Sequence, residues 1–117
     1  MKKLFLVFLF LPFIGFAYDE GAYLVQKYNC LSCHDFSLKR TGPSFAEIAK
    51  KYGTSEKAAE RVARIIINPP SFMPPFKIPF SQAKKLAEYI LKEGAKAARE
   101  QKKHHEDDYI DLWSEFH

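Results

Sequence analysis

The stretch Cys30-Leu31-Ser32-Cys33-His34 limits what this chain can fold into more than any other feature of its sequence. In the pattern C-x-x-C-H, two thiols add across the vinyl groups of a haem and form thioether bonds. The histidine that follows supplies the proximal ligand to the iron. These two cysteines are the only ones in the chain, so this use consumes both. The motif predicts one covalently attached haem c, and a small fold that packs around it.

The same residues have two other interpretations, a thiol–disulfide redox pair and a zinc site. A redox C-x-x-C is expected within a βαβ pattern, and a structural zinc site needs a second pair of ligands. The sequence shows neither pattern. Covalent haem attachment is therefore the interpretation that the residues favour.

The surroundings of Met73 predict a second ligand on the opposite side of the iron. Apart from Met1 it is the only methionine, and Pro70, Pro74 and Pro75 lie close to it. Prolines fix φ and stiffen a loop, and a thioether ligand raises the reduction potential of haem iron. The alternative is a methionine that fills a gap in the core. We predict that His34 and Met73 are the two axial ligands.

Residues 1–17 have the pattern of an export signal. Lys2 and Lys3 precede an apolar run over residues 4–16, and Gly15 and Ala17 place small residues before a cleavage site. The run is shorter than the roughly 20 residues that span a bilayer, and Pro12 interrupts it. We expect a signal peptide and a periplasmic protein. The alternative is an uncleaved anchor, which would be the protein's own attachment to a membrane.

The charge of the chain after residue 17 is unevenly distributed. Residues 18–117 carry sixteen basic and fourteen acidic side chains, a formal charge of +2, but residues 18–95 carry +4 and residues 96–117 carry −2. Such a balance is not typical of a nucleic-acid-binding surface. It favours docking to redox proteins, with charge acting on association rate and orientation. The candidate steering residues are Lys27, Lys39, Arg40 and Lys77.

Apolar residues recur at helical spacing, and no segment alternates as a strand requires. Gly53 is expected to end the second helix, and Thr54 or Ser55 to cap the third. Gly94 either caps the fourth helix or lies within a helix that continues. The sequence therefore predicts an all-α domain over residues 18–95. The four stripes are Leu24, Val25 and Tyr28; Phe45, Ile48, Ala49 and Tyr52; Ala59, Val62, Ala63 and Ile66; and Ala83, Leu86, Ala87 and Ile90.

Residues 96–117 form a charged extension that is rich in helix-forming residues. Tyr109, Leu112, Trp113 and Phe116 have helical spacing and lie among acidic residues. An amphipathic helix of this kind can dock in a partner's groove, and this one could also fold back on the oppositely charged body. The alternative is a frayed terminus.

Together these residues resemble the small class I c-type cytochromes, and most closely the bacterial cytochrome c551/c552 (c8) group. The resemblance covers residues 21–94 and is strongest from Asn29 to Gly53. It implies an all-α fold of about four helices around one haem, with the first and last helices crossing. It also implies a single-electron carrier rather than an enzyme, with the carbonyl of Pro43 accepting a hydrogen bond from His34. Phe76 departs from the group, in which a polar residue often follows Met-Pro-Pro.

Two other functions stay open at this point. In one, the sixth iron position is open or labile, and the protein is a sensor or catalyst; His104 and His105 are then nearby alternative ligands. In the other, the chain is a haem subunit of a larger redox complex, such as a sulfur-oxidising one, and the segment around Trp113 is its tether. Otherwise we expect a monomer that reaches membranes only through its redox partners.

Overall fold

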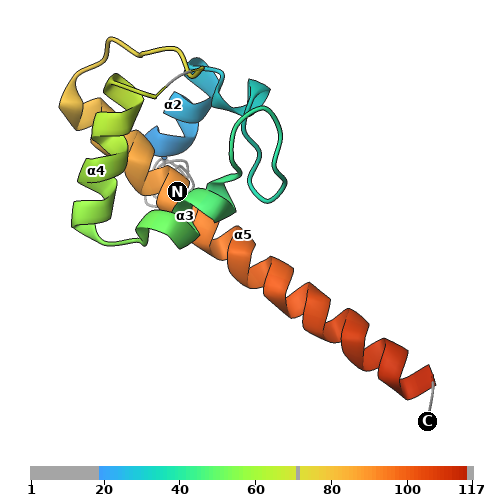
Figure 1. Ribbon diagram of the computed structural model, residues 1–117. Helices are drawn as coiled ribbons and strands as arrows, with labels where there is room; N and C mark the ends of the chain where they lie inside the picture. The colour runs from blue at the N-terminus through green and yellow to red at the C-terminus, as the bar shows by residue number, and fades with distance from the viewer. Residues whose placement is uncertain (1–18, 71, 116–117) are drawn as a thin grey trace, which may run out of the picture.

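The computed structural model describes residues 19–70 and 72–115, and every regular element in these two ranges is helical (Figure 1). The predicted export signal lies outside the described residues. The all-α class, with four α-helices, is confirmed. The elements in chain order are α2 (Glu20–Lys27), the 3₁₀ turn η2 (Cys30–Ser32), α3 (Phe45–Tyr52), α4 (Glu56–Ile67) and α5 (Phe80–Glu115).

Helix α2 crosses the first part of α5 at very close range. Asp19 caps α2 by accepting hydrogen bonds from the backbone of Gly21 and Ala22. A Cβ atom on Gly21 would overlap the side chain of Tyr89, so the crossing requires glycine at this position. The buried stripe of α2 then meets α5, and Lys85 of α5 forms an ion pair with Glu20 at 2.7 Å. The predicted crossing of the first and last helices is therefore present.

Helix α3 lies across α5, and its two ends follow from single residues. The hydroxyl of Ser44, the N-cap, accepts a hydrogen bond from the backbone N–H of Glu47 at 3.0 Å. Gly53 ends the helix with φ +85°, a conformation that favours glycine. Phe45, in the first turn, is 1% exposed and is among the largest side chains of the core.

Helix α4 closes the other side of the core. Ser55 caps it through the backbone N–H of Ala58, as predicted, and the helix ends at Ile67, just before Asn68 and Pro69. Its apolar stripe faces α5, which packs against α2, α3 and α4 in turn. The buried stripe of α4 comprises Ala58, Ala59, Val62, Ala63 and Ile66.

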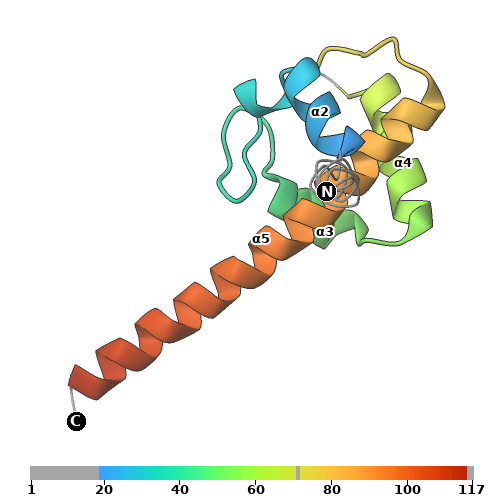
Figure 2. The same cartoon turned by 180° about the vertical axis from the view of Figure 1, so that it is seen from behind.

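Helix α5 is 36 residues long and passes through Gly94 without a break. The idea that Gly94 caps the fourth helix is wrong, because the helix continues past this residue. Glycine is needed there for another reason: α5 approaches α3 so closely that a Cβ atom would overlap the carbonyl of Phe45. The idea that the extension folds back on the body is also wrong. Residues 96–115 continue the helix and project away from the body (Figures 1 and 2). Among the described residues, no helix is both long and apolar enough to cross a membrane.

Candidate haem-binding site

A tight turn presents the C-x-x-C-H motif at the end of α2. Asn29 adopts a left-handed conformation with φ 57°, which redirects the chain from α2 into η2. The backbone N–H of His34 then donates to the carbonyl of Cys30 at 3.0 Å. As a result the two cysteines lie one turn apart. Cys30 is half-buried against the core, whereas Cys33 is exposed.

The two thiols differ in their surroundings. Burial raises the pKa of the Cys30 thiol, and a backbone hydrogen bond opposes this only in part. The thiolate is the more reactive form of cysteine, so burial lowers the reactivity of the Cys30 thiol.

The imidazole of His34 is held in a defined orientation. Its Nδ1 atom lies 2.7 Å from the carbonyl oxygen of Pro43. Because a carbonyl oxygen only accepts, Nδ1 carries a proton, and in the neutral ring the lone pair is then on Nε2. A backbone acceptor of this kind fixes the orientation of a metal-binding histidine. The ring also stacks on Phe45, with centroids 6.0 Å apart.

Gly42 provides the space that the His34 ring occupies. A Cβ atom at residue 42 would lie 2.8 Å from Nδ1 and closer still to Cε1. The backbone N–H of Gly42 donates to the carbonyl of Cys33 at 2.8 Å, which ties this segment to the motif. In the structure Ser44 is the N-cap, and the two preceding residues contact the histidine.

The loop between His34 and α3 is held by hydrogen bonds that the sequence analysis did not identify. The carboxylate of Asp35 accepts from the backbone N–H groups of Leu38 and Ser37, at 2.9 and 3.2 Å, and these bonds hold its pKa below the usual value. The guanidinium of Arg40 donates to the carbonyl of Leu31 at 2.8 Å. Aspartate is a recognised turn residue, because its side chain can accept a hydrogen bond from the backbone N–H two residues on.

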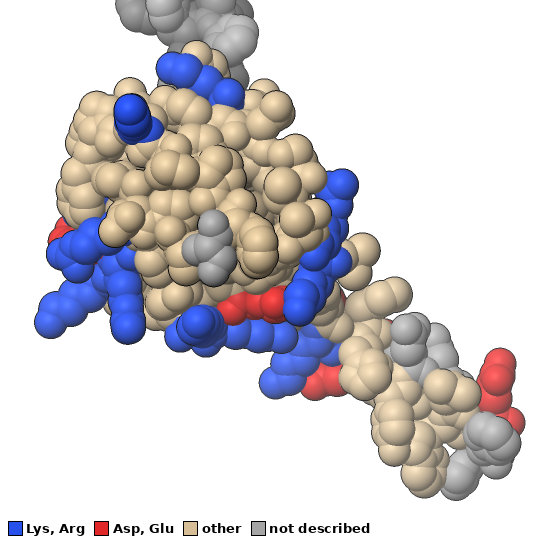
Figure 3. All heavy atoms as spheres, turned by 45° about the horizontal axis from the view of Figure 1, so that its top comes forward, with Lys and Arg blue, Asp and Glu red and all other residues tan. Residues whose placement is uncertain are grey.

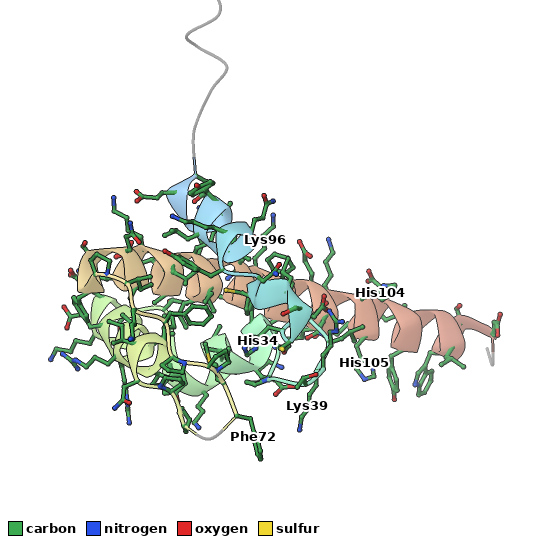
Figure 4. All side chains as sticks on the ribbon, turned by 90° about the horizontal axis from the view of Figure 1, so that it is seen from above. His34, Lys39, Phe72, Lys96, His104 and His105 are labelled. Atoms are coloured by element: carbon green, nitrogen blue, oxygen red, sulfur yellow. The ribbon has the colours of Figure 1, made fainter. Side chains whose placement is uncertain are left out.

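The structure places Met73 on the loop of residues 68–79, which joins α4 to α5. Its side chain is half-buried and packs against the core. The ring of Phe76 meets that of Tyr28 edge to face, with centroids 5.5 Å apart. Phe76, the position at which this chain differs from the c551/c552 group, therefore has a packing role. Phe72, by contrast, is 99% exposed and points away from the body (Figure 4).

His104 and His105 come from the projecting part of α5 and are both exposed (Figure 4). Over the described residues, no group of three or more His, Cys, Asp or Glu side chains is arranged to hold a metal ion. The candidate ligand set that remains is the one around the C-x-x-C-H motif. It offers two thiols one turn apart, an imidazole with a free Nε2 and a glycine that leaves room for the ring. These donors fit a haem bound through thioether bonds and one histidine.

Comparison with known proteins identifies the family. A family profile described as cytochrome c oxidase, cbb3-type, subunit III matches residues 16–90, well over half of the chain. Cytochrome c-552 of Hydrogenobacter thermophilus is 36% identical over 98 residues, which are 78% of this chain and 97% of the relative. The chain belongs to the c-type cytochrome family. A c-type cytochrome carries haem c, with its iron, in covalent linkage, and the single C-x-x-C-H motif makes this one a monohaem electron carrier.

Two further relatives agree with this assignment. Cytochrome c-551 of Stutzerimonas stutzeri is 35% identical over 79 residues, 62% of this cytochrome and 76% of the relative. Cytochrome c2 of Rubrivivax gelatinosus is 36% identical over 80 residues, 61% of this cytochrome and 94% of the relative. The resemblance to the c551/c552 group is therefore confirmed.

Proposed function

We propose that this cytochrome carries single electrons with its iron held between His34 and Met73, and with Cys30 and Cys33 as the two thioether residues. The observation that carries this proposal is the 2.7 Å hydrogen bond from His34 Nδ1 to the carbonyl of Pro43. In the neutral ring this bond leaves the lone pair on Nε2, on a residue that directly follows the two cysteines. The same bond increases the basicity of the ligand.

The protein's part is to hold both ligands while the charge on the iron changes. When bound, the haem supplies an iron that alternates between the ferric and ferrous states. The Pro43 carbonyl and the Phe45 ring keep His34 from turning, and Pro74 and Pro75 restrict the loop behind Met73. A thioether ligand favours the ferrous state and raises the potential. With both axial positions filled, no substrate binds the iron.

The visible spectrum of the matured holoprotein tests the ligand pair. A weak far-red band in the ferric form reports a methionine–iron bond. We expect this band in the wild type, its loss in Met73→Ala, and its retention in Phe72→Ala. Phe72 is a matched control because it is the neighbouring residue and is 99% exposed. A wild-type ferric spectrum without the band, or a high-spin spectrum that shifts when imidazole is added, would instead support an open sixth position.

We also propose an export signal over residues 1–17, a cytochrome domain over residues 18–95 and an extension over residues 96–117. The signal supports a periplasmic location, where redox proteins are the partners. Lys39 and Arg40 are exposed on the loop that follows His34, which supports electrostatic steering of acidic partners. The test is the association rate with an acidic redox protein. We expect it to fall steeply with salt, and a flat dependence would contradict steering.

A further inference from the structure

The last turns of α5 carry a concentrated set of exposed apolar side chains. Tyr109, Ile110, Leu112 and Trp113 are 60%, 62%, 56% and 53% exposed. Single exposed apolar residues are ordinary on protein surfaces, whereas several within two helical turns indicate an interaction site. The question is which surface covers this end of the helix.

An open hollow beside residues 88–99 of α5 lies on the same helix face as Trp113. Its volume is about 470 Å³. Eighteen residues of an α-helix make five turns, so Ala95, which lines the hollow, is directly in line with Trp113. Leu91 is likewise in line with Tyr109. The lining residues are Thr54, Ser55, Glu56, Ala59, Glu88, Leu91, Lys92, Ala95 and Arg99.

Charge separates the tip of α5 from the rest of the chain. Residues 104–117 contain five acidic and no lysine or arginine side chains, whereas residues 18–103 contain sixteen basic and nine acidic ones. Lysines and arginines surround the body and the base of the projecting helix, and acidic side chains appear near the tip (Figure 3). Because the helix is continuous and projects outward, the tip cannot reach its own body. A second copy offers the complementary charge.

We propose that two copies of this cytochrome pair through antiparallel α5 helices, each placing Trp113 in the hollow over Ala95 of the other. In this register the two-fold axis of the dimer passes at the level of residue 104 in both helices. The register also sets Glu106 opposite Lys102 and Tyr109 opposite Arg99. The first pair is of opposite charge, and the second allows a guanidinium to lie over an aromatic ring. The interface is the same surface on both copies, as two-fold symmetry requires.

The acidic residues of the hollow do not oppose this arrangement strongly. Glu56 already forms an ion pair with Lys84 at 2.8 Å. Lys92 and Arg99 also line the hollow and supply two positive charges for the incoming acidic tip. The proposal replaces the monomer that the sequence alone predicts, and it is independent of how the iron is ligated.

Sedimentation velocity of the matured holoprotein over a range of concentrations tests the pairing. We expect a monomer–dimer equilibrium for the wild type that weakens with salt. Trp113→Ala should raise the dimer dissociation constant about tenfold or more, as buried aromatic anchors do. His104→Ala is the control, because His104 is exposed, lies two and a half turns from Trp113 on the opposite face of the helix, and its replacement keeps every acidic side chain of the tip. A wild type that stays monomeric at the highest soluble concentration overturns the proposal. This also holds if the monomer binds a redox partner.

A charge exchange tests the register itself. Lys102→Glu and Glu106→Lys should each weaken the dimer, because either one places like charges across the interface. The double variant Lys102→Glu/Glu106→Lys restores opposite charges on both copies, so it should recover most of the wild-type affinity. If the double variant dimerises as weakly as the summed effects of the two single variants predict, the antiparallel register is overturned.

Discussion

The two parts of α5 have the same backbone structure but different surroundings. Residues 80–95 pack against α2, α3 and α4, and Ala83, Leu86, Ala87 and Leu91 are at most 2% exposed. Residues 99–107 are all exposed, as are Tyr109, Ile110 and residues 112–115. One uninterrupted helix is therefore held by tertiary packing along its first part and by local forces along its second.

This difference shows that helical continuity is no guide to where a domain ends. Ala95, Ala97, Ala98 and the neighbouring Arg, Gln and Lys residues are among the strongest helix formers, so the extension needs no packing to stay helical. A hydrogen bond from the side-chain amide of Gln101 to the carbonyl of Ser37, at 2.8 Å, connects the first turns of the extension to the body. Substitutions can separate the two sources of stability.

The largest difference should come from removing a leucine from each part. Leu86 is 1% exposed and Leu112 is 56% exposed. We expect Leu86→Ala to lower the free energy of unfolding by about 2–5 kcal/mol, because it leaves a cavity. Leu112→Ala should change it by less than about 0.5 kcal/mol. Urea unfolding of the dilute holoprotein measures both. Equal losses would mean that the extension is part of the same core.

The next contrast is between adding and removing a methyl group. Gly94→Ala should destabilise the protein by about 1–3 kcal/mol, because the methyl group would overlap the Phe45 carbonyl. Helix propensity alone would predict a gain of about 1 kcal/mol. Ala98→Gly, in the extension, should follow propensity and reduce the helical signal with little effect on the unfolding midpoint. A stabilised Gly94→Ala variant would show that α3 can move away from α5.

The smallest effect concerns charge pairing. The hydrogen bond and charge of Lys84 hold the pKa of Glu56 below its usual value of 4.5. A lowered carboxyl pKa stabilises the fold above the unfolded-state pKa, and this contribution is lost as pH falls. The gap in thermal midpoint between wild type and Glu56→Gln should therefore be present at neutral pH and close under acid conditions. A gap that persists in acid would argue against the ion pair.

The sequence predicted the helices and the motif because both are local patterns. The stripes of α3 and α4, the cap at Ser55 and the stop at Gly53 all depend on residues within one or two turns. Gly94 was ambiguous because its role depends on Phe45, about fifty residues earlier in the chain. The same holds for Gly42, whose contact with His34 depends on a loop that Asp35 and other residues hold together. Close approaches between segments that are far apart in the chain have no fixed sequence spacing, so a single sequence does not reveal them.

The crossing of α2 and α5 also sets an order of events in time. The segment with Cys30 and Cys33 is synthesised well before α5, yet the body closes only when α5 meets α2 near Gly21. Until then the chain has no partner for the buried stripe of α2. Closing so long a loop is slow compared with forming a local turn. Until the last helix is made, the segment that carries the two thiols therefore belongs to a chain whose core is still open.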